Sequence, residues 1–106
     1  MTAISWTEPA SADFLGIVEW IEERNPTAAI RVGRRILDAA ELLADHPYLG
    51  KPGRSPDTRE LGVPGFRYLM VYGVEPGAMA SDASQVAILR VLHGAMMWPS
   101  QGADSP

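Results

Sequence analysis

Five side chains in the second half of the chain have the chemistry of an RNA-cleaving site. They are three arginines, one glutamate and one histidine: Arg59, Glu60, Arg67, Arg90 and His93. Cleavage of RNA to a 2′,3′-cyclic phosphate needs a base for the 2′-hydroxyl, an acid for the leaving oxygen and cations around the phosphorane. Glu60 or His93 could transfer these protons, because a histidine side chain titrates near neutral pH. The arginines could hold the phosphate, so a nuclease is one function that this set supports.

Each of these side chains also has an ordinary structural role. Arg59 and Glu60 are adjacent, and such residues form surface ion pairs or solvate the edge of a strand. Arg90 lies between two apolar residues, where a guanidinium needs a carboxylate partner, and Glu60 is a candidate. His93 follows the same apolar run and can donate a hydrogen bond to a nearby carbonyl group. The sequence leaves both interpretations open.

The composition limits the other kinds of chemistry. The chain has 106 residues, of which 46% are hydrophobic and 21% are charged, as is typical of one globular domain. It has no cysteine and only two histidines, so we expect no disulfide, no thiol catalysis, no metal site and no cofactor. The formal net charge of −4 argues against nonspecific binding of nucleic acid. No apolar run reaches the roughly 20 residues of a membrane span, so we expect a cytoplasmic protein without a membrane partner.

The first half of the chain predicts one strand and two helices. Residues 3–7 alternate apolar and polar side chains, which is the period of a half-buried strand. Apolar residues then recur at helical spacing over about 8–24. Asn25 and Pro26 end this helix and begin another over about 26–45, because Asn caps helices and Pro is tolerated in the first turn. The short connection predicts an antiparallel helical hairpin.

The second half predicts strands after a loop rich in Gly and Pro. Strand patterns occupy three segments: 59–63, 66–74 and 85–93. Pro64 and Gly65 form a strong turn signal, so the first two of these strands should make an antiparallel hairpin. The element order is therefore β-α-α-β-β-β, an α+β fold with a helical hairpin packed on one face of a mainly antiparallel sheet. We expect a single domain over 1–106, with a tail at about 100–106.

Two apolar features are candidates for binding a partner. The second helix is apolar over a wide arc that includes Ile30 and Leu37. This arc is either buried against the first helix and the sheet, or it offers a groove to the amphipathic helix of another chain. Trp98 belongs to an apolar cluster near the C-terminus, which either covers the sheet or contacts a partner.

Several segments, taken in order, resemble the RelE/ParE toxin superfamily of type II toxin–antitoxin systems. They cover about residues 4–99 and are Ile4 to Ala10, Asn25-Pro26, Gly53-Arg54, Thr58 to Leu61, Val71-Tyr72, Ile88 to Gly94, and Trp98-Pro99. The resemblance implies a small toxin that is neutralised by a cognate antitoxin, ParD-like or RelB-like, in a hetero-oligomer. RelE-like members cut mRNA on the ribosome, whereas ParE-like members poison DNA gyrase.

Within this superfamily, the residues favour the ParE-like branch. The nucleases use a cluster of Lys and Arg, sometimes with Glu and His, together with a C-terminal Tyr or His on the sheet. Here Leu69 stands where the nucleases usually have Arg, and no Tyr follows His93. We therefore expect a gyrase-poisoning toxin of the kind that stabilises plasmids, with no catalytic residue. Its expected antitoxin contacts are Ile30, Leu37, Arg59, Arg90 and Trp98. The alternatives are a ribosome-dependent mRNA endoribonuclease, and a non-toxic member that retains only antitoxin binding.

Overall fold

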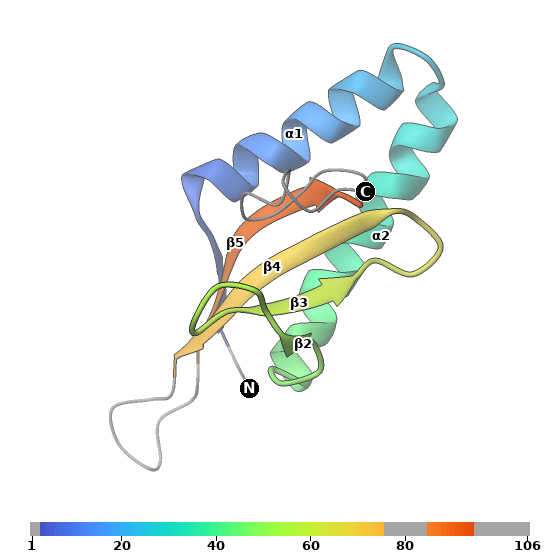
Figure 1. Ribbon diagram of the computed structural model, residues 1–106. Helices are drawn as coiled ribbons and strands as arrows, with labels where there is room; N and C mark the ends of the chain where they lie inside the picture. Colours follow the sequence, from blue (N-terminus) through green and yellow to red (C-terminus); the bar gives the residue numbers. More distant parts are fainter. Residues whose placement is uncertain (1–2, 76–84, 95–106) are drawn as a thin grey trace.

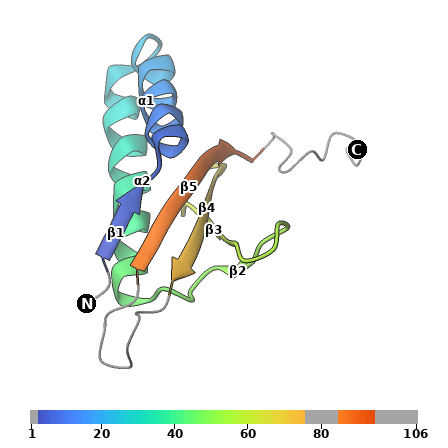
Figure 2. The same ribbon diagram turned by 90° about the vertical axis from the view of Figure 1, so that its left-hand side faces the viewer.

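The computed structural model, which describes residues 3–75 and 85–94, has a helical hairpin on one face of a five-stranded sheet (Figure 1). Its elements are β1 (Ala3–Trp6), α1 (Glu8–Glu22), α2 (Pro26–Asp45), β2 (Lys51–Pro52), β3 (Arg59–Gly62), β4 (Tyr68–Glu75) and β5 (Gln85–His93). Seen from the side, both helices lie on the same side of the sheet (Figure 2). The predicted α+β fold is therefore confirmed.

The strands follow the order β1-β5-β4-β3-β2 across the sheet. β1 pairs with β5 in parallel, and the other neighbours are antiparallel. The prediction missed the two-residue β2, because Pro52 interrupts any strand pattern. A proline fits here because β2 lies at the edge of the sheet. The predicted tail and most of the segment between the last two predicted strands, residues 75–84, lie outside the described residues.

Side-chain caps set the two helices. The Thr7 hydroxyl accepts a hydrogen bond from the Ala10 N–H at 3.2 Å, and the Asn25 side chain accepts one from the Ala28 N–H at 3.1 Å. Each cap satisfies a backbone donor that the first turn of a helix leaves free. α1 ends slightly earlier than predicted because the Arg24 and Asn25 N–H groups both turn back to the Ile21 carbonyl. The predicted antiparallel hairpin is confirmed.

The hairpin of β3 and β4 is made by the predicted Pro64-Gly65 turn. Gly65 has φ = 84°, a value that suits glycine at the third position of a type II turn after proline. The Phe66 N–H closes the turn by donating to the Val63 carbonyl at 3.2 Å. This use of Phe66 explains why β4 begins at Tyr68, two residues later than predicted.

A buried tyrosine holds the loop after α2 against the sheet. Tyr72 is 0% exposed, and its hydroxyl accepts a hydrogen bond from the buried Gly50 N–H at 2.8 Å. A Cβ atom at Gly50 would lie 2.6 Å from the Glu60 carbonyl oxygen, so only glycine allows this approach. The Arg59 guanidinium donates to the carbonyl groups of Gly50 and Tyr48. The loop and β3 are thereby fixed to each other.

Tyr72→Phe tests this anchor. The change removes one hydroxyl and leaves the buried Gly50 N–H without its acceptor, so the free energy of unfolding should fall by about 1–3 kcal/mol. Urea denaturation followed by circular dichroism measures the loss. Tyr48→Phe is the matched control, because Tyr48 is 59% exposed, and it should change stability by less than about 0.5 kcal/mol. Equal effects of the two substitutions would contradict the anchoring role.

Candidate functional site

Glu60 and His93, the two candidates for proton transfer, lie on opposite faces of the sheet. Glu60 pairs with Val71, whereas His93 pairs with Tyr68. Directly paired residues share a face and successive residues alternate. Tyr68 packs against the helix-side core and Val71 therefore faces away from it. Strand spacing places the two Cα atoms roughly 14 Å apart. These side chains are not arranged to act as base and acid on one phosphodiester.

Glu60 is a buried part of the fold. Its side chain is 1% exposed, and its Oε2 atom accepts a hydrogen bond from the Arg54 N–H at 3.1 Å. The Arg54 Nε atom lies 3.8 Å from the same oxygen. A buried carboxylate is stable only with such partners. Glu60 therefore holds the loop before β3 and is not presented to a substrate.

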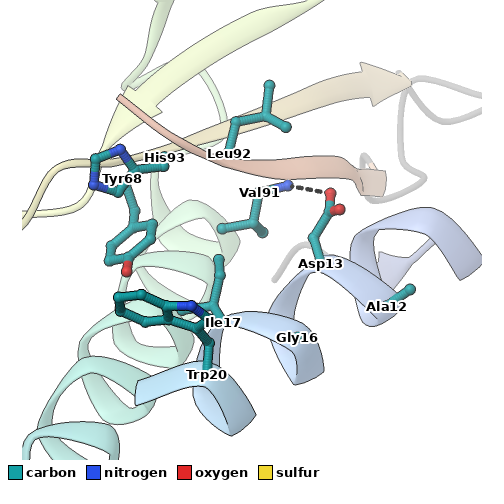
Figure 3. Close-up of a pocket in the computed structure, with 9 residues that line it drawn as sticks. All are labelled: Ala12, Asp13, Gly16, Ile17, Trp20, Tyr68, Val91, Leu92 and His93. Carbon is teal, nitrogen blue, oxygen red and sulfur yellow. Dashed lines mark hydrogen bonds between the residues drawn. The ribbon is translucent and has the colours of Figure 1, made fainter. Parts of the chain in front are cut away.

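Arg90 forms a structural ion pair, as one of its two interpretations predicted, but the partner is Asp13 of α1 and the candidate Glu60 is wrong. The Arg90 Nε and Nη2 atoms lie 2.6 Å and 3.0 Å from the two carboxylate oxygens. The Val91 N–H also donates to Asp13, at 3.0 Å (Figure 3). Hydrogen bonding to Asp13 and its charge raise the pKa of Arg90 above its usual value, against a smaller opposing effect of burial.

Asp13 is not among the predicted site residues, although the sequence contains a local signal for it. Asp13 lies three residues after the buried Ala10 and four before Ile17, so a carboxylate stands within the apolar stripe of α1. An acid at such a position needs a partner on the surface that the helix covers. Its partner is 77 residues away in sequence, on β5.

The remaining candidates do not complete a nuclease site. The guanidinium of Arg59 is bonded to loop carbonyl groups, as described above. Arg67 is exposed before β4, and its carbonyl accepts a hydrogen bond from the Gly94 N–H. The ring of His93 meets that of Tyr68 edge to face, with centroids 5.3 Å apart. Arg67 and His93 lie at one end of the sheet, away from Glu60.

An open groove of ≈ 550 Å³ lies between α1 and the end of β5. Its lining residues are Ala12, Asp13, Gly16, Ile17, Trp20, Tyr68, Val91, Leu92 and His93 (Figure 3). Trp20 is 59% exposed, with the Arg24 guanidinium 3.7 Å from its ring centroid. Burial raises the pKa of Tyr68, so its phenol stays protonated at neutral pH. The groove can bind an apolar side chain and donate hydrogen bonds.

A second apolar surface lies on the outer side of the helical hairpin. Ile30 is 66% exposed, Leu37 is 45% exposed and Leu15 of α1 is 56% exposed. Leu15 and Leu37 line a small hollow together with Trp6, Ser11 and Phe14. We call Leu15, Ile30 and Leu37 the outer apolar surface. The predicted arc of α2 thus has a buried part and an exposed part, and both predicted helix contacts are exposed.

The last predicted contact and the expected absence of a metal site and a membrane span are considered together. The predicted contact Trp98 lies outside the described residues. Within residues 3–75 and 85–94, no group of three or more His, Asp or Glu side chains could hold a metal ion. In the same part of the chain, no helix has the length and apolarity needed to cross a membrane.

Comparisons with known proteins place this fold among toxins. Residues 4–98 match the family model described as the ParE toxin of the type II toxin–antitoxin system parDE. A solved structure described as the chromosomal ParDE system from P. aeruginosa superposes with a TM-score of 0.72 at 21% identity. It covers 88% of this chain and 96% of that one. This similarity extends to the fold of almost the whole domain.

Relatives in sequence include two toxins that are named RelE. Toxin Y4kP of Sinorhizobium fredii is 36% identical over 96 residues, covering 91% of this chain and 92% of the relative. Toxin RelE2 of Caulobacter vibrioides is 31% identical over 97 residues, covering 92% and 100%. Toxin RelE1 of the same organism is 31% identical over 87 residues, covering 80% and 85%.

Asp13→Asn tests the contact between α1 and β5. The side chain keeps its size but loses its charge and one acceptor for Arg90, so the free energy of unfolding should fall by about 1–2 kcal/mol. The figure allows for solvent screening, because the Arg90 side chain is 36% exposed. Urea denaturation measures it. Glu23→Gln, which breaks the exposed pair with Arg24, should cost less than about 0.5 kcal/mol. A loss no larger than this control would contradict the assigned role.

Proposed function

Because the chain belongs to the ParE toxin family of type II toxin–antitoxin systems, we propose that it stops growth by binding DNA gyrase until a cognate antitoxin neutralises it. The family supplies the antitoxin as partner. Gyrase as the target is the finer part of the proposal. It rests on the ParE-like features of the sequence and on the arrangement of the candidate catalytic residues.

The observation that carries this proposal is the separation of Glu60 from His93 across the sheet. A nuclease needs an acid, a base and cations around one phosphate. In this chain Glu60 is buried against Arg54, and Arg90 is bonded to Asp13. A toxin with its polar groups held in this way is better suited to act by binding a protein than by cutting RNA.

The outer apolar surface supports the antitoxin part of the proposal. Ile30 and Leu37 are seven residues apart and lie on the same side of α2. Exposed apolar side chains in such a row fit the apolar face of an amphipathic helix. We infer that the antitoxin covers this surface, where it would remove Leu15, Ile30 and Leu37 from water.

A second candidate function is a ribosome-dependent mRNA endoribonuclease. The similarity to toxins RelE1 and RelE2 favours it. Its remaining candidate groups would be the exposed Arg67 and the half-buried His93, at one end of the sheet. A non-toxic chain that only binds its antitoxin is the third possibility. The next experiment separates the gyrase proposal from both alternatives.

The purified chain should inhibit gyrase directly. Incubation with DNA gyrase, ATP and relaxed plasmid should abolish supercoiling on an agarose gel, with or without trapped linear DNA. Preincubation with the antitoxin should restore supercoiling, and heat-denatured chain should have no effect. If gyrase stays fully active with folded chain that still binds its antitoxin, the gyrase proposal is wrong.

Ile30→Ala and Leu37→Ala should weaken the antitoxin complex while leaving the isolated fold stable. Each truncation removes contact area, and a loss of more than about 1 kcal/mol, roughly fivefold in Kd, is expected by isothermal titration calorimetry. Stability should change by less than about 0.5 kcal/mol, because both side chains are exposed.

Two control variants on the same helix make this test specific. Leu42→Ala removes a leucine of similar exposure, 42%, from a different side of α2, and should leave the Kd unchanged. Ile36→Ala truncates a side chain that is 0% exposed and should lower stability by about 2–5 kcal/mol. The outer apolar surface would be ruled out as the antitoxin site if Leu42→Ala raised the Kd of the antitoxin complex equally. It would also be ruled out if Ile30→Ala and Leu37→Ala left that Kd unchanged.

A further inference from the structure

Three arginines on one turn of α2 line a hollow that contains no acidic side chain. Arg31, Arg34 and Arg35 have the spacing that places side chains on the same side of a helix. With Gly65 and Phe66 of the turn between β3 and β4, they enclose an open hollow of ≈ 420 Å³. All three arginines are exposed. The hollow shares no lining residue with the groove beside β5. On α2 it adjoins the outer apolar surface, because Arg34 lies beside Ile30 and Leu37.

The fold itself gives this cluster little to bind. Arg35 donates one hydrogen bond from Nη1 to the Pro64 carbonyl at 3.2 Å. The ion pairs among the described residues involve other arginines, namely Arg24, Arg54 and Arg90. Like charges three and four residues apart destabilise a helix by a few tenths of a kcal/mol per pair. Asp38 lies at the same spacing from Arg34 and Arg35, but among the described residues it forms no ion pair with either. An anion from outside the chain would offset the repulsion that remains.

The turn opposite α2 leaves the hollow open. Gly65 has no side chain, and a Cβ atom there would lie 3.7 Å from the Arg35 Nη1 atom. Phe66 is half-buried and forms part of the wall. The hollow therefore combines three guanidinium groups with an aromatic side chain, and aromatic rings stack on nucleobases.

Phosphate groups match this arrangement better than carboxylates do. A guanidinium group presents five N–H donors in a planar fork. One carboxylate accepts a pair of hydrogen bonds from a single guanidinium group. A chain of phosphates offers enough oxygens for three forks together. The hollow has the size of a small-molecule site. The hollow extends over only one turn of α2, and the chain has a net charge of −4. Both features argue against binding of a long nucleic acid.

We propose that the hollow formed by Arg31, Arg34, Arg35 and Phe66 binds a small polyphosphate ligand of the nucleoside triphosphate class. The phosphates lie on the guanidinium groups and the base lies against Phe66. The negative net charge of the chain does not prevent this, because charges farther away than about 8 Å are screened at physiological salt.

Calorimetric titration of the purified full chain with sodium tripolyphosphate and with ATP tests the proposal. Saturable binding with one ligand per chain is expected, and Arg31→Gln and Arg34→Gln should each raise both dissociation constants at least tenfold. Lys51→Gln is the matched control, because it removes the same unit charge from an exposed position on β2 and should leave binding unchanged. Phe66→Leu should weaken ATP more than tripolyphosphate. Circular dichroism confirms that each variant is folded.

Three outcomes would overturn the proposal. One is the absence of saturable binding by either probe. Another is equal weakening by Lys51→Gln and Arg34→Gln, which would indicate attraction by net charge alone. The last is arginine-dependent binding of a single-stranded oligonucleotide or a poly-glutamate peptide that is tighter than that of tripolyphosphate, which would assign the hollow to a polymer.

Discussion

The half of β5 that β1 does not cover is the constraint on which the rest of the structure depends. β1 pairs only with residues 85–88, so within the part of the chain that the structure describes no strand pairs with β5 from Leu89 onward on that side. The Thr7 hydroxyl binds the Leu89 carbonyl, and Asp13 binds the Val91 N–H and the Arg90 guanidinium. An unpaired strand edge invites pairing with another chain. Capping it from α1 fixes that helix over the sheet and creates the groove beside Trp20.

The local features of the fold were predictable, and the long-range ones were not. The cap at Asn25 and the turn at Gly65 lie where they were predicted, and the cap at Thr7 also follows from its residue type. The pairing of Asp13 with Arg90 joins residues 77 apart, and local periodicity gives no information at that range. Its single hint is an acid within an apolar stripe.

The strand register of the candidate site was likewise not predictable from local sequence. The register of β4 and β5 shifts between Val71 and Tyr72, so that Leu89 has no paired residue. A shift of one residue moves every following side chain to the other face. Without it, Tyr68 would pair with Leu92, and His93 would share a face with Glu60. The sequence thus identified plausible residues, but one irregularity in β5 decides that they do not form one site. The exposed side chains of the outer apolar surface suit binding to another protein.

The central claim is that this chain stops growth by binding a protein target and not by cutting RNA. The most direct measurement is to express it in cells without antitoxin and to map mRNA 5′ ends across the transcriptome while sampling plasmid topology. The account predicts growth arrest with relaxed plasmid and an unchanged set of 5′ ends. New 5′ ends within translated regions, with plasmid supercoiling intact, would contradict it.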